Sequence, residues 1–399
     1  MSKNSNKRDI SPILPAAASG ATKPVGEKFG VILVIADGRP YEVATFRQDI
    51  GTADHRHPDK IKPSTPEEDA SRRDFTINGI FYDPVVKKIY DFVGGRKDIK
   101  AEVIRFIGDG NKRISEDYLR MLRAIRFKNT LGFSYAEGAE TAIKNYSRQI
   151  TNISWERIRD ELNLMFSDDS RLASLHDLDN LDLLKYILPE LVELKKIDQP
   201  AKFESGQGDA FLHTMMVIKN LPNPDVERSA LSVELIWAAI LHDLGKPDTI
   251  DFKPDLRFGR RPTFYGHMAA SARIAKKVCQ RLRLTVEQTD KIAWLVACHM
   301  MVGDIIKMRP GKQVNWLRHD WLAELLELHR ADASGKDKRI NLYYYETVKK
   351  MREEELAKPE PPKPLVDGND IMTAFHLPPS KEIGRLLEIA WDAQAAGES

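Results

Sequence analysis

The chain has 399 residues, of which 42% are hydrophobic, and this length is enough for about two to three domains with sizeable cores. Its formal net charge is only +2, so affinity for RNA has to come from a local basic face. Cys279 and Cys298 stand in apolar helical patterns without metal-site spacing, which indicates buried, reduced thiols. We find no signal-peptide core and no run of membrane-spanning length, so we expect a cytoplasmic protein with no membrane partner.

The N-terminal part predicts an irregular tail followed by a hairpin. Residues 1–28 are rich in Ser, Ala, Pro, Lys and Gly and show no periodicity. An apolar, β-branched run over 29–36 then leads through Asp37 and Gly38, a strong turn signal, into an alternating strand over 41–46.

The next segment, 48–70, is polar and predicts a mobile loop that carries Asp49, Asp54, His55, Arg56 and His57. Residues 80–82 and 88–92 flank Asp83-Pro84 and predict a second small hairpin.

Apolar residues at helical spacing predict an amphipathic helix over 115–127, with Ser115 as its N-cap. Asp117 and Arg120 are three residues apart and are expected on one face, in a stripe that continues with Arg123 and Arg126. Such a stripe is commonly a solvated face with an intrahelical ion pair. A nucleotide site is the alternative, because Asp only accepts hydrogen bonds and Arg donates them in a fixed fork.

An ordered series of motifs surrounds this helix: Arg72-Arg73-Asp74-Phe75-Thr76-Ile77-Asn78, the segment 91–99, and Glu116-Asp117-x-x-Arg120. Together they resemble the class II tRNA nucleotidyltransferase and bacterial poly(A) polymerase family, from about Val25 to the C-terminus. The resemblance implies that Asp117 and Arg120 imitate a base partner and select CTP or ATP for addition to tRNA or another RNA 3′ end. It further implies a set of nucleotide-binding residues: Arg73, Asp74, Asn78, Asp117, Arg120, Arg123 and Arg126.

The same resemblance implies an α+β, mainly α protein with a nucleotidyltransferase β-sheet head, a helical neck and an all-α HD domain. The expected parts are a tail (1–28), the head (29–134), an RNA-binding neck (135–200), the HD domain (201–345) and a C-terminal helical element near the RNA (346–399). A helix that simply caps the HD core is an equal alternative for the last part.

The head departs from the family at its metal site. Glu42 looks like the third active-site carboxylate, but an ordinary exposed acid is the alternative. The family holds two Mg²⁺ ions with this residue and an upstream Asp-x-Asp pair, which follows a Gly-Gly-x-Val-Arg-Asp turn. Neither element stands upstream of Glu42 here, so we expect impaired nucleotidyl transfer. A truncated or misread gene start, degeneration of the head and rescue by another chain are all open explanations.

A second constellation surrounds a His-Asp pair. The apolar helix expected over 233–241 runs into His242 and Asp243, and Gly245 and Pro247 are expected to end it. Histidines and aspartates follow one another along the chain in the order His, His-Asp, His, His, Asp. This series resembles the HD superfamily of metal-dependent phosphohydrolases, with four expected metal ligands: His213, His242, Asp243 and Asp332. His267 and His299 match the extra histidines of some members, or are neutral core histidines.

Mixed His and carboxylate ligands suit Mg²⁺, Mn²⁺, Ni²⁺ or Zn²⁺. Lys246 is expected to contact a substrate phosphate or to lie on the surface. Two functions stay open: an RNA nucleotidyltransferase of the CCA-adding type, with poly(A) polymerase as a variant, and a phosphohydrolase or 2′,3′-cyclic phosphodiesterase with an RNA-binding head. The missing Asp-x-Asp favours the second, and the motif at Glu116 favours the first. The oligomeric state is not written in the sequence.

Overall fold

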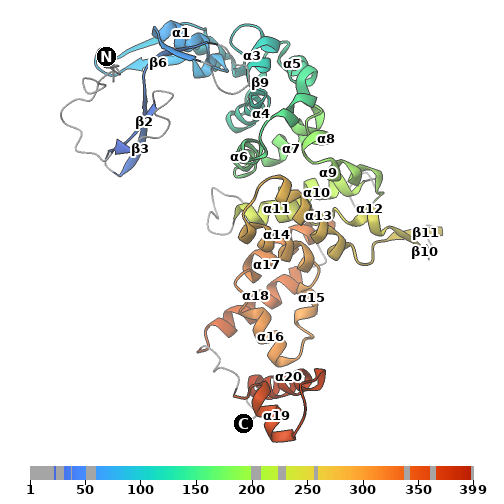
Figure 1. Ribbon diagram of the computed structural model, residues 1–399. Coiled ribbons are helices and arrows are strands. Elements are labelled where there is room, and N and C mark those ends of the chain that lie inside the picture. The colour runs from blue at the N-terminus through green and yellow to red at the C-terminus, as the bar shows by residue number, and fades with distance from the viewer. Residues whose placement is uncertain are drawn as a thin grey trace, which may run out of the picture. The chain divides into compact units, whose positions relative to one another are not determined.

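The computed structural model describes residues 22–23, 31–36, 38–50, 60–198, 208–222, 231–255, 259–336, 342–359 and 365–396. Most of these residues are helical and the sheets are short and antiparallel, which confirms the expected mainly α, α+β class (Figure 1). They divide into two units, one ending at Asp117 and one beginning at Tyr118. The predicted irregular tail over 1–28 is wrong at residues 22–23, which form a strand, and its residues 1–21 and 24–28 lie outside the described residues, as do the loop residues Asp54, His55, Arg56 and His57.

The first unit contains the predicted hairpins. β1 (Thr22–Lys23), β2 (Val31–Ala36) and β3 (Arg39–Ala44) form an antiparallel sheet in that order, and Gly38 has the positive φ of +72° that its turn requires. β6 (Ile80–Asp83) pairs with β7 (Lys88–Asp91), as predicted.

The predicted loop over 48–70 is wrong for its described part. β4 (Arg47–Ile50) pairs there with β5 (Lys60–Pro63), and α1 (Pro66–Ser71) follows. A capping box starts α1, because Thr65 and Glu68 each accept a hydrogen bond from the other's backbone N–H. The rest of this unit consists of η3 (Thr76–Asn78), α2 (Gly95–Ala101), β8 (Val103–Ile104) and α3 (Gly110–Glu116).

The second unit is built from helices and a protruding hairpin. Up to residue 198 it contains α4 (Leu119–Leu131), β9 (Ser134–Tyr135), α5 (Ala139–Tyr146), η4 (Ser147–Asn152), α6 (Trp155–Phe166), α7 (Arg171–Asn180), α8 (Leu184–Ile187), α9 (Pro189–Glu193) and η5 (Leu194–Lys196). Then come α10 (Ala210–Lys219), α11 (Val233–Leu241), α12 (Lys246–Thr249), β10 (Asp251–Asp255), β11 (Gly259–Thr263), α13 (His267–Arg281), α14 (Val286–Cys298), α15 (Val302–Ile305), α16 (Pro310–Leu317), α17 (Leu322–Lys336), α18 (Leu342–Leu356), α19 (Gly368–Phe375) and α20 (Lys381–Ala396).

Helix α11 is the centre of this unit. It is apolar almost all round and buried from Leu235 onward, and α10, α13, α14 and α17 pack against it (Figure 1). Trp237 is fully buried, meets the Phe166 ring edge-on at 5.8 Å and donates its Nε1–H to Asn163. This packing fixes the end of α11, where the His-Asp pair follows.

Within the described part of the chain, we find no helix long and apolar enough to cross a bilayer.

Candidate metal centre and nucleotide site

Glu42 lies on β3 opposite Leu33 of β2, and its side chain is exposed. Among the described residues, no group of three metal-ligating side chains includes Glu42; the groups found all lie in the second unit. The described residues around Glu42 therefore do not fit the two Mg²⁺ ions that the resemblance implies for the head, and we assign no step to such ions there.

The structure brings the predicted residues Arg73, Asp74 and Asn78 together. Asp74 accepts hydrogen bonds from the Asn78 side-chain amide and the Phe75 backbone N–H, both at 2.9 Å. Arg73 donates to the Asn78 carbonyl at 2.8 Å and binds Asp69 at 3.0 Å. Sequence reasoning missed Asp69, a buried acid that also binds Arg72 at 2.6 Å and so orients both arginines.

The predicted continuous helix over 115–127 is wrong. α3 ends at Glu116, Asp117 is extended with φ −154° and ψ 108°, and α4 begins at Leu119. Ser115 is not an N-cap but lies in the last turn of α3, where its hydroxyl donates to the Lys112 carbonyl. Asp117 is therefore outside α4, and the three-residue spacing to Arg120 gives no shared helix face. Apolar periodicity cannot reveal one extended residue between two helices.

The arginine stripe itself is present on α4. Arg120, Arg123 and Arg126 are half-buried, whereas Leu119 and Leu122 on the same helix are buried. Arg126 binds Glu161 of α6 at 2.6 Å, and both side chains are largely buried. This ion pair gives Arg126 a role in packing α4 on α6.

The His-Asp pair follows α11 at a tightly packed turn. α11 ends at Leu241 as expected, but Pro247 lies in the first turn of α12 rather than acting as a stop. Gly245 donates its N–H to the Ser271 hydroxyl at 2.8 Å, and a Cβ at this position would lie 2.5 Å from the His267 carbonyl oxygen. Glycine at 245 therefore allows the start of α13, which carries His267, to approach the pair.

The six predicted HD residues come together although they span 120 positions of the sequence. They form two groups of possible metal ligands: His213, His242 and Asp332, and Asp243, His267 and His299. His213 Nε2 lies 2.8 Å from Asp332 and 3.6 Å from Asp243. His242 Nε2 lies 3.0 Å from Asp243, which links the groups.

Backbone carbonyls orient three of these imidazoles. The Nδ1 atoms of His242, His267 and His299 lie 2.7–2.8 Å from the carbonyl oxygens of Ala239, Phe264 and Val296. A carbonyl only accepts, so each Nδ1 carries the proton and each Nε2 keeps a lone pair facing inward. Such contacts are typical of metal-binding histidines.

The inward-facing nitrogens lack adequate partners. His267 Nε2 and His299 Nε2 are 3.4 Å apart, and the buried His242 Nε2 makes no hydrogen bond although an Asp243 oxygen, itself only an acceptor, lies 3.0 Å away. Lone pairs that face each other in a buried site repel unless a cation lies between them. The donor set therefore fits a divalent ion.

The protonation states also fit metal binding. Burial lowers the pKa of His213 and His267, and burial together with the neighbouring His242 lowers the pKa of His299 to about 3. Burial alone raises the pKa of Asp243, but His242 and Lys246 hold it well below its usual value. Neutral imidazoles and ionised carboxylates are the forms that bind metals.

Lys246 is not on the surface. It is 5% exposed, its Nζ lies 2.5 Å from Asp243, and it stands 5.3 Å from the centroid of the Phe264 ring. A buried ammonium beside the ligand carboxylate adds a positive charge next to the cluster.

The lowered pKa of His299 makes the metal-free protein sensitive to acid. The unfolded chain takes up this proton near pH 6.5, and the folded chain only near pH 3, so stability is lost as the pH falls below about 6.5. Between about pH 7 and pH 5 the free energy of unfolding should fall by on the order of 2 kcal/mol.

Urea unfolding in EDTA measures this change in the free energy of unfolding. His299→Gln should reduce the pH dependence by this amount and leave the part that comes from the lowered pKa values of His213 and His267, and His176→Gln, at an exposed position, should leave the whole dependence intact. An identical pH dependence of His299→Gln and the parent protein contradicts the assignment.

Comparisons with known proteins cover most of the chain. Three family models match: the poly(A) polymerase head domain over 2–105, the probable RNA and SrmB-binding site of polymerase A over 132–194, and the HD domain over 223–356. The head match begins at residue 2, so the likeness extends further toward the N-terminus than Val25.

Among curated proteins, an A-adding tRNA nucleotidyltransferase of Deinococcus radiodurans is 31% identical over 351 residues, which cover 84% of this chain and 77% of the relative. A CCA-adding enzyme of Lactobacillus helveticus is 35% identical over 208 residues, which cover 51% of each chain. The chain thus spans about half the length of that relative.

Solved structures show the same fold. The Bacillus stearothermophilus CCA-adding enzyme in complex with CTP aligns with a TM-score of 0.65 at 23% identity, over 95% of this chain and 80% of that one. The Thermotoga maritima CCA-adding enzyme complexed with tRNA aligns with a TM-score of 0.53 at 20% identity, over 96% and 78%.

Proposed function

This chain belongs to the tRNA nucleotidyltransferase family, and we propose that within this family it acts on the 3′ ends of tRNA or other RNA. The head would bind CTP and ATP, the nucleotides of the CCA-adding type, with A-only addition and poly(A) synthesis as variants. The A-adding and CCA-adding relatives, together with the neighbours solved with CTP, ATP and tRNA, support this proposal. Two unpaired cysteines fit the cytoplasmic location that we propose.

The proposed parts are those drawn from the sequence, with a head over 29–134, a neck over 135–200, an HD domain over 201–345 and a C-terminal element over 346–399. The proposed nucleotide contacts are Arg73, Asp74 and Asn78 for the triphosphate and sugar, and Asp117, Arg120 and Arg123 for the base and phosphates. The mutual contacts of the first three and the half-buried arginine stripe on α4 support these assignments.

Nucleotide selectivity tests this part of the proposal. The chain should bind ATP or CTP better than GTP or UTP, by on the order of tenfold, because two directed hydrogen bonds discriminate between bases by about 1–3 kcal/mol. Asp117→Ala and Arg120→Ala should each remove the preference in a fluorescent-nucleotide competition assay. The exposed ion pair Glu193–Lys196 provides matched controls, Glu193→Ala and Lys196→Ala, which should keep it. Equal binding of all four nucleotides by the parent chain contradicts the assignment.

The buried six-residue cluster favours a second activity, metal-dependent hydrolysis of a phosphate ester. His213, His242, Asp243 and Asp332 would hold the ion, with His267 and His299 as further ligands for a second ion. The unpartnered, inward-facing Nε2 atoms are the observation that carries this proposal. Mg²⁺, Mn²⁺, Ni²⁺ and Zn²⁺ are the candidates for this donor set.

A bound divalent ion supplies a water of lowered pKa, near roughly 7, and polarises a phosphoryl oxygen. Around it, Asp243 and Asp332 provide negative charge, and the carbonyl-bound histidines keep their rings in place. In this proposal the Lys246 ammonium, which is paired with Asp243, contacts a substrate phosphate. The proposed substrates are a 2′,3′-cyclic phosphate at an RNA end and a free nucleotide phosphate. Hydrolysis of 2′,3′-cyclic AMP after chelation and re-addition of each ion is the test, and no hydrolysis with any of them overturns this activity.

A further inference from the structure

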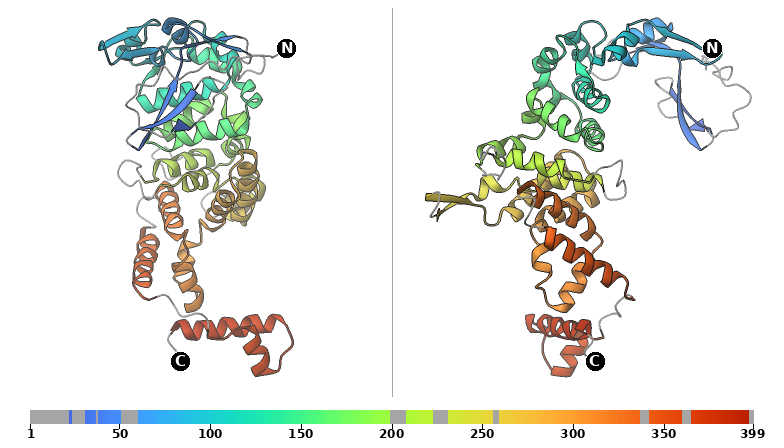
Figure 2. Two further views of the ribbon diagram at one scale, coloured as in Figure 1. Left: turned by 60° about the vertical axis from the view of Figure 1, so that its left-hand side comes forward. Right: turned by 180° about the vertical axis from the view of Figure 1, so that it is seen from behind.

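The hairpin β10–β11 is inserted between two members of the candidate metal centre. The chain leaves Asp243 through α12, runs out along β10, returns along β11 and reaches His267 at the first residue of α13. The strands are paired from Asp251 and Thr263 to Asp255 and Gly259. Figures 1 and 2 show the hairpin extending away from the helices of its unit. The hairpin therefore starts and ends at the cluster.

Its base is connected to the ligands by direct contacts. Phe264, next to the last residue of β11, accepts the hydrogen bond from His267 Nδ1 through its carbonyl and lies against the Lys246 ammonium with its ring. Thr263 is buried, and its hydroxyl donates to the Asp251 carbonyl at 3.3 Å. The base of the hairpin is therefore adjacent to the cluster.

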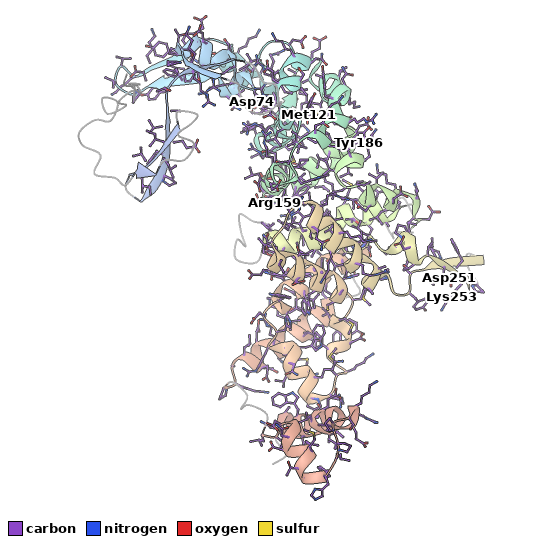
Figure 3. The ribbon with its side chains drawn as sticks, viewed as in Figure 1. Asp74, Met121, Arg159, Tyr186, Asp251 and Lys253 are labelled. Carbon is purple, nitrogen blue, oxygen red and sulfur yellow. The ribbon has the colours of Figure 1, made fainter. Side chains whose placement is uncertain are left out.

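The hairpin and the turn that follows it expose aromatic rings next to positive charge. Tyr265 is 70% exposed and Phe252 is 47% exposed. Lys253 Nζ lies 4.3 Å from the centroid of the Tyr265 ring and 3.1 Å from its hydroxyl oxygen. Figure 3 labels Lys253 and Asp251 on this hairpin. Exposed rings that stack bases, with cations that face phosphates, are typical of single-strand nucleic-acid sites.

The charge pattern points to the same kind of ligand. Lys253 and Arg261 are paired in the backbone register of the two strands. Residues 250–266 contain four basic and two acidic side chains. One of these acids, Asp251, accepts a hydrogen bond from the backbone N–H of Phe252.

We propose that this hairpin binds single-stranded RNA adjacent to its 3′ end, with a base stacked on Tyr265 and a phosphate facing Lys253. The terminal phosphate is then delivered to the HD cluster. This inference rests on the proposed hydrolytic function of that cluster. It makes an RNA end, rather than a free nucleotide, the preferred substrate of the site.

Binding tests the inference independently of hydrolysis. A 5′-fluorescein oligoribonucleotide with a 3′-phosphate is titrated with the full chain and followed by anisotropy. The double variant Lys253→Ala/Tyr265→Ala should bind at least about tenfold more weakly, since one stacked base contributes about 1–3 kcal/mol. The matched control is Lys350→Ala/Tyr343→Ala on α18, where Tyr343 is 68% exposed, and it should bind like the parent. Unchanged binding by the first variant overturns the inference.

Hydrolysis separates this inference from the proposed function. On an oligoribonucleotide with a 2′,3′-cyclic end, Lys253→Ala/Tyr265→Ala should raise KM about tenfold and leave kcat unchanged. On 2′,3′-cyclic AMP, which is too short to reach along the hairpin, kcat/KM should stay at the parent value. Equal losses on both substrates overturn the inference. If the parent hydrolyses neither substrate but the variant still loses oligonucleotide binding, the proposed hydrolysis fails while the hairpin assignment stands.

Discussion

Replacing Asp243 by Asn is expected to remove both divalent-metal binding and phosphate-ester hydrolysis. Asp243 is 1% exposed, lies within 3.7 Å of three histidine Nε2 atoms, and joins the two ligand groups. Removing a group that only hydrogen-bonds a metal ligand lowers metal affinity by about 10–100-fold. Removing the Asp243 carboxylate itself should therefore lower metal affinity by more than about 100-fold. Elemental analysis and 2′,3′-cyclic AMP hydrolysis measure the two effects.

Two further variants keep this result interpretable. Asp243→Asn leaves the buried Lys246 without its carboxylate, which is destabilising in itself. Asp243→Asn/Lys246→Met removes both charges and should restore folding, as followed by circular dichroism, but not metal binding. Asp290→Asn on α14, at an exposed carboxylate, should behave like the parent. Full activity of Asp243→Asn, or a parent protein that binds no divalent ion, shows that the cluster is structural.

The head of this chain is expected to lack nucleotidyl transfer. This 399-residue chain should add no nucleotide to tRNA lacking its CCA end when Mg²⁺, CTP and ATP are supplied. Glu42 is exposed, and no described group of metal-ligating side chains includes it. Charge neutralisation is a main catalytic contribution in phosphoryl transfer, so its loss should lower the rate by about 10³-fold or more.

Incorporation of labelled ATP measures the rate, with the A-adding enzyme of Deinococcus radiodurans as a positive control. Glu42→Gln should cause no further loss, because a carboxylate that belongs to no group of metal-ligating side chains among the described residues contributes little. Robust incorporation by the parent chain contradicts the prediction and points to carboxylates that neither the motif nor the described residues reveal.

The grouping of the six HD residues could be predicted because its signal lies in residue types and their order, whereas their role as metal ligands stays a prediction. The six residues were named from the His, His-Asp, His, His, Asp series, and the structure brings all of them together. The contacts that orient the rings could not be predicted, since the acceptors are backbone carbonyls of Ala239, Phe264 and Val296 and any residue type provides such a carbonyl. The burial of Lys246 could not be predicted from the sequence either, because it depends on how α13 packs.

The wrong secondary-structure predictions lie where a short local feature of the backbone does not disturb the apolar periodicity of the sequence. Asp117 is one extended residue between two helices, and apolar spacing runs through it undisturbed. The hairpin β10–β11 was not anticipated, since Lys253-Pro254-Asp255 lacks a strand signal. The start of α1 could have been predicted, because Thr65 and Glu68 carry the spacing of a capping box.

The contact between His213 and Asp332 joins residues 119 positions apart, on α10 and α17. An ion held by this pair and His242 would link α10 to α17 reversibly and so stabilise the second unit. A ligand that binds only the native state at about 100 times its Kd adds about 2.7 kcal/mol to stability. Resistance of this unit to proteases should therefore follow the supply of metal, so that starvation for the ion shortens the lifetime of the protein before it limits turnover.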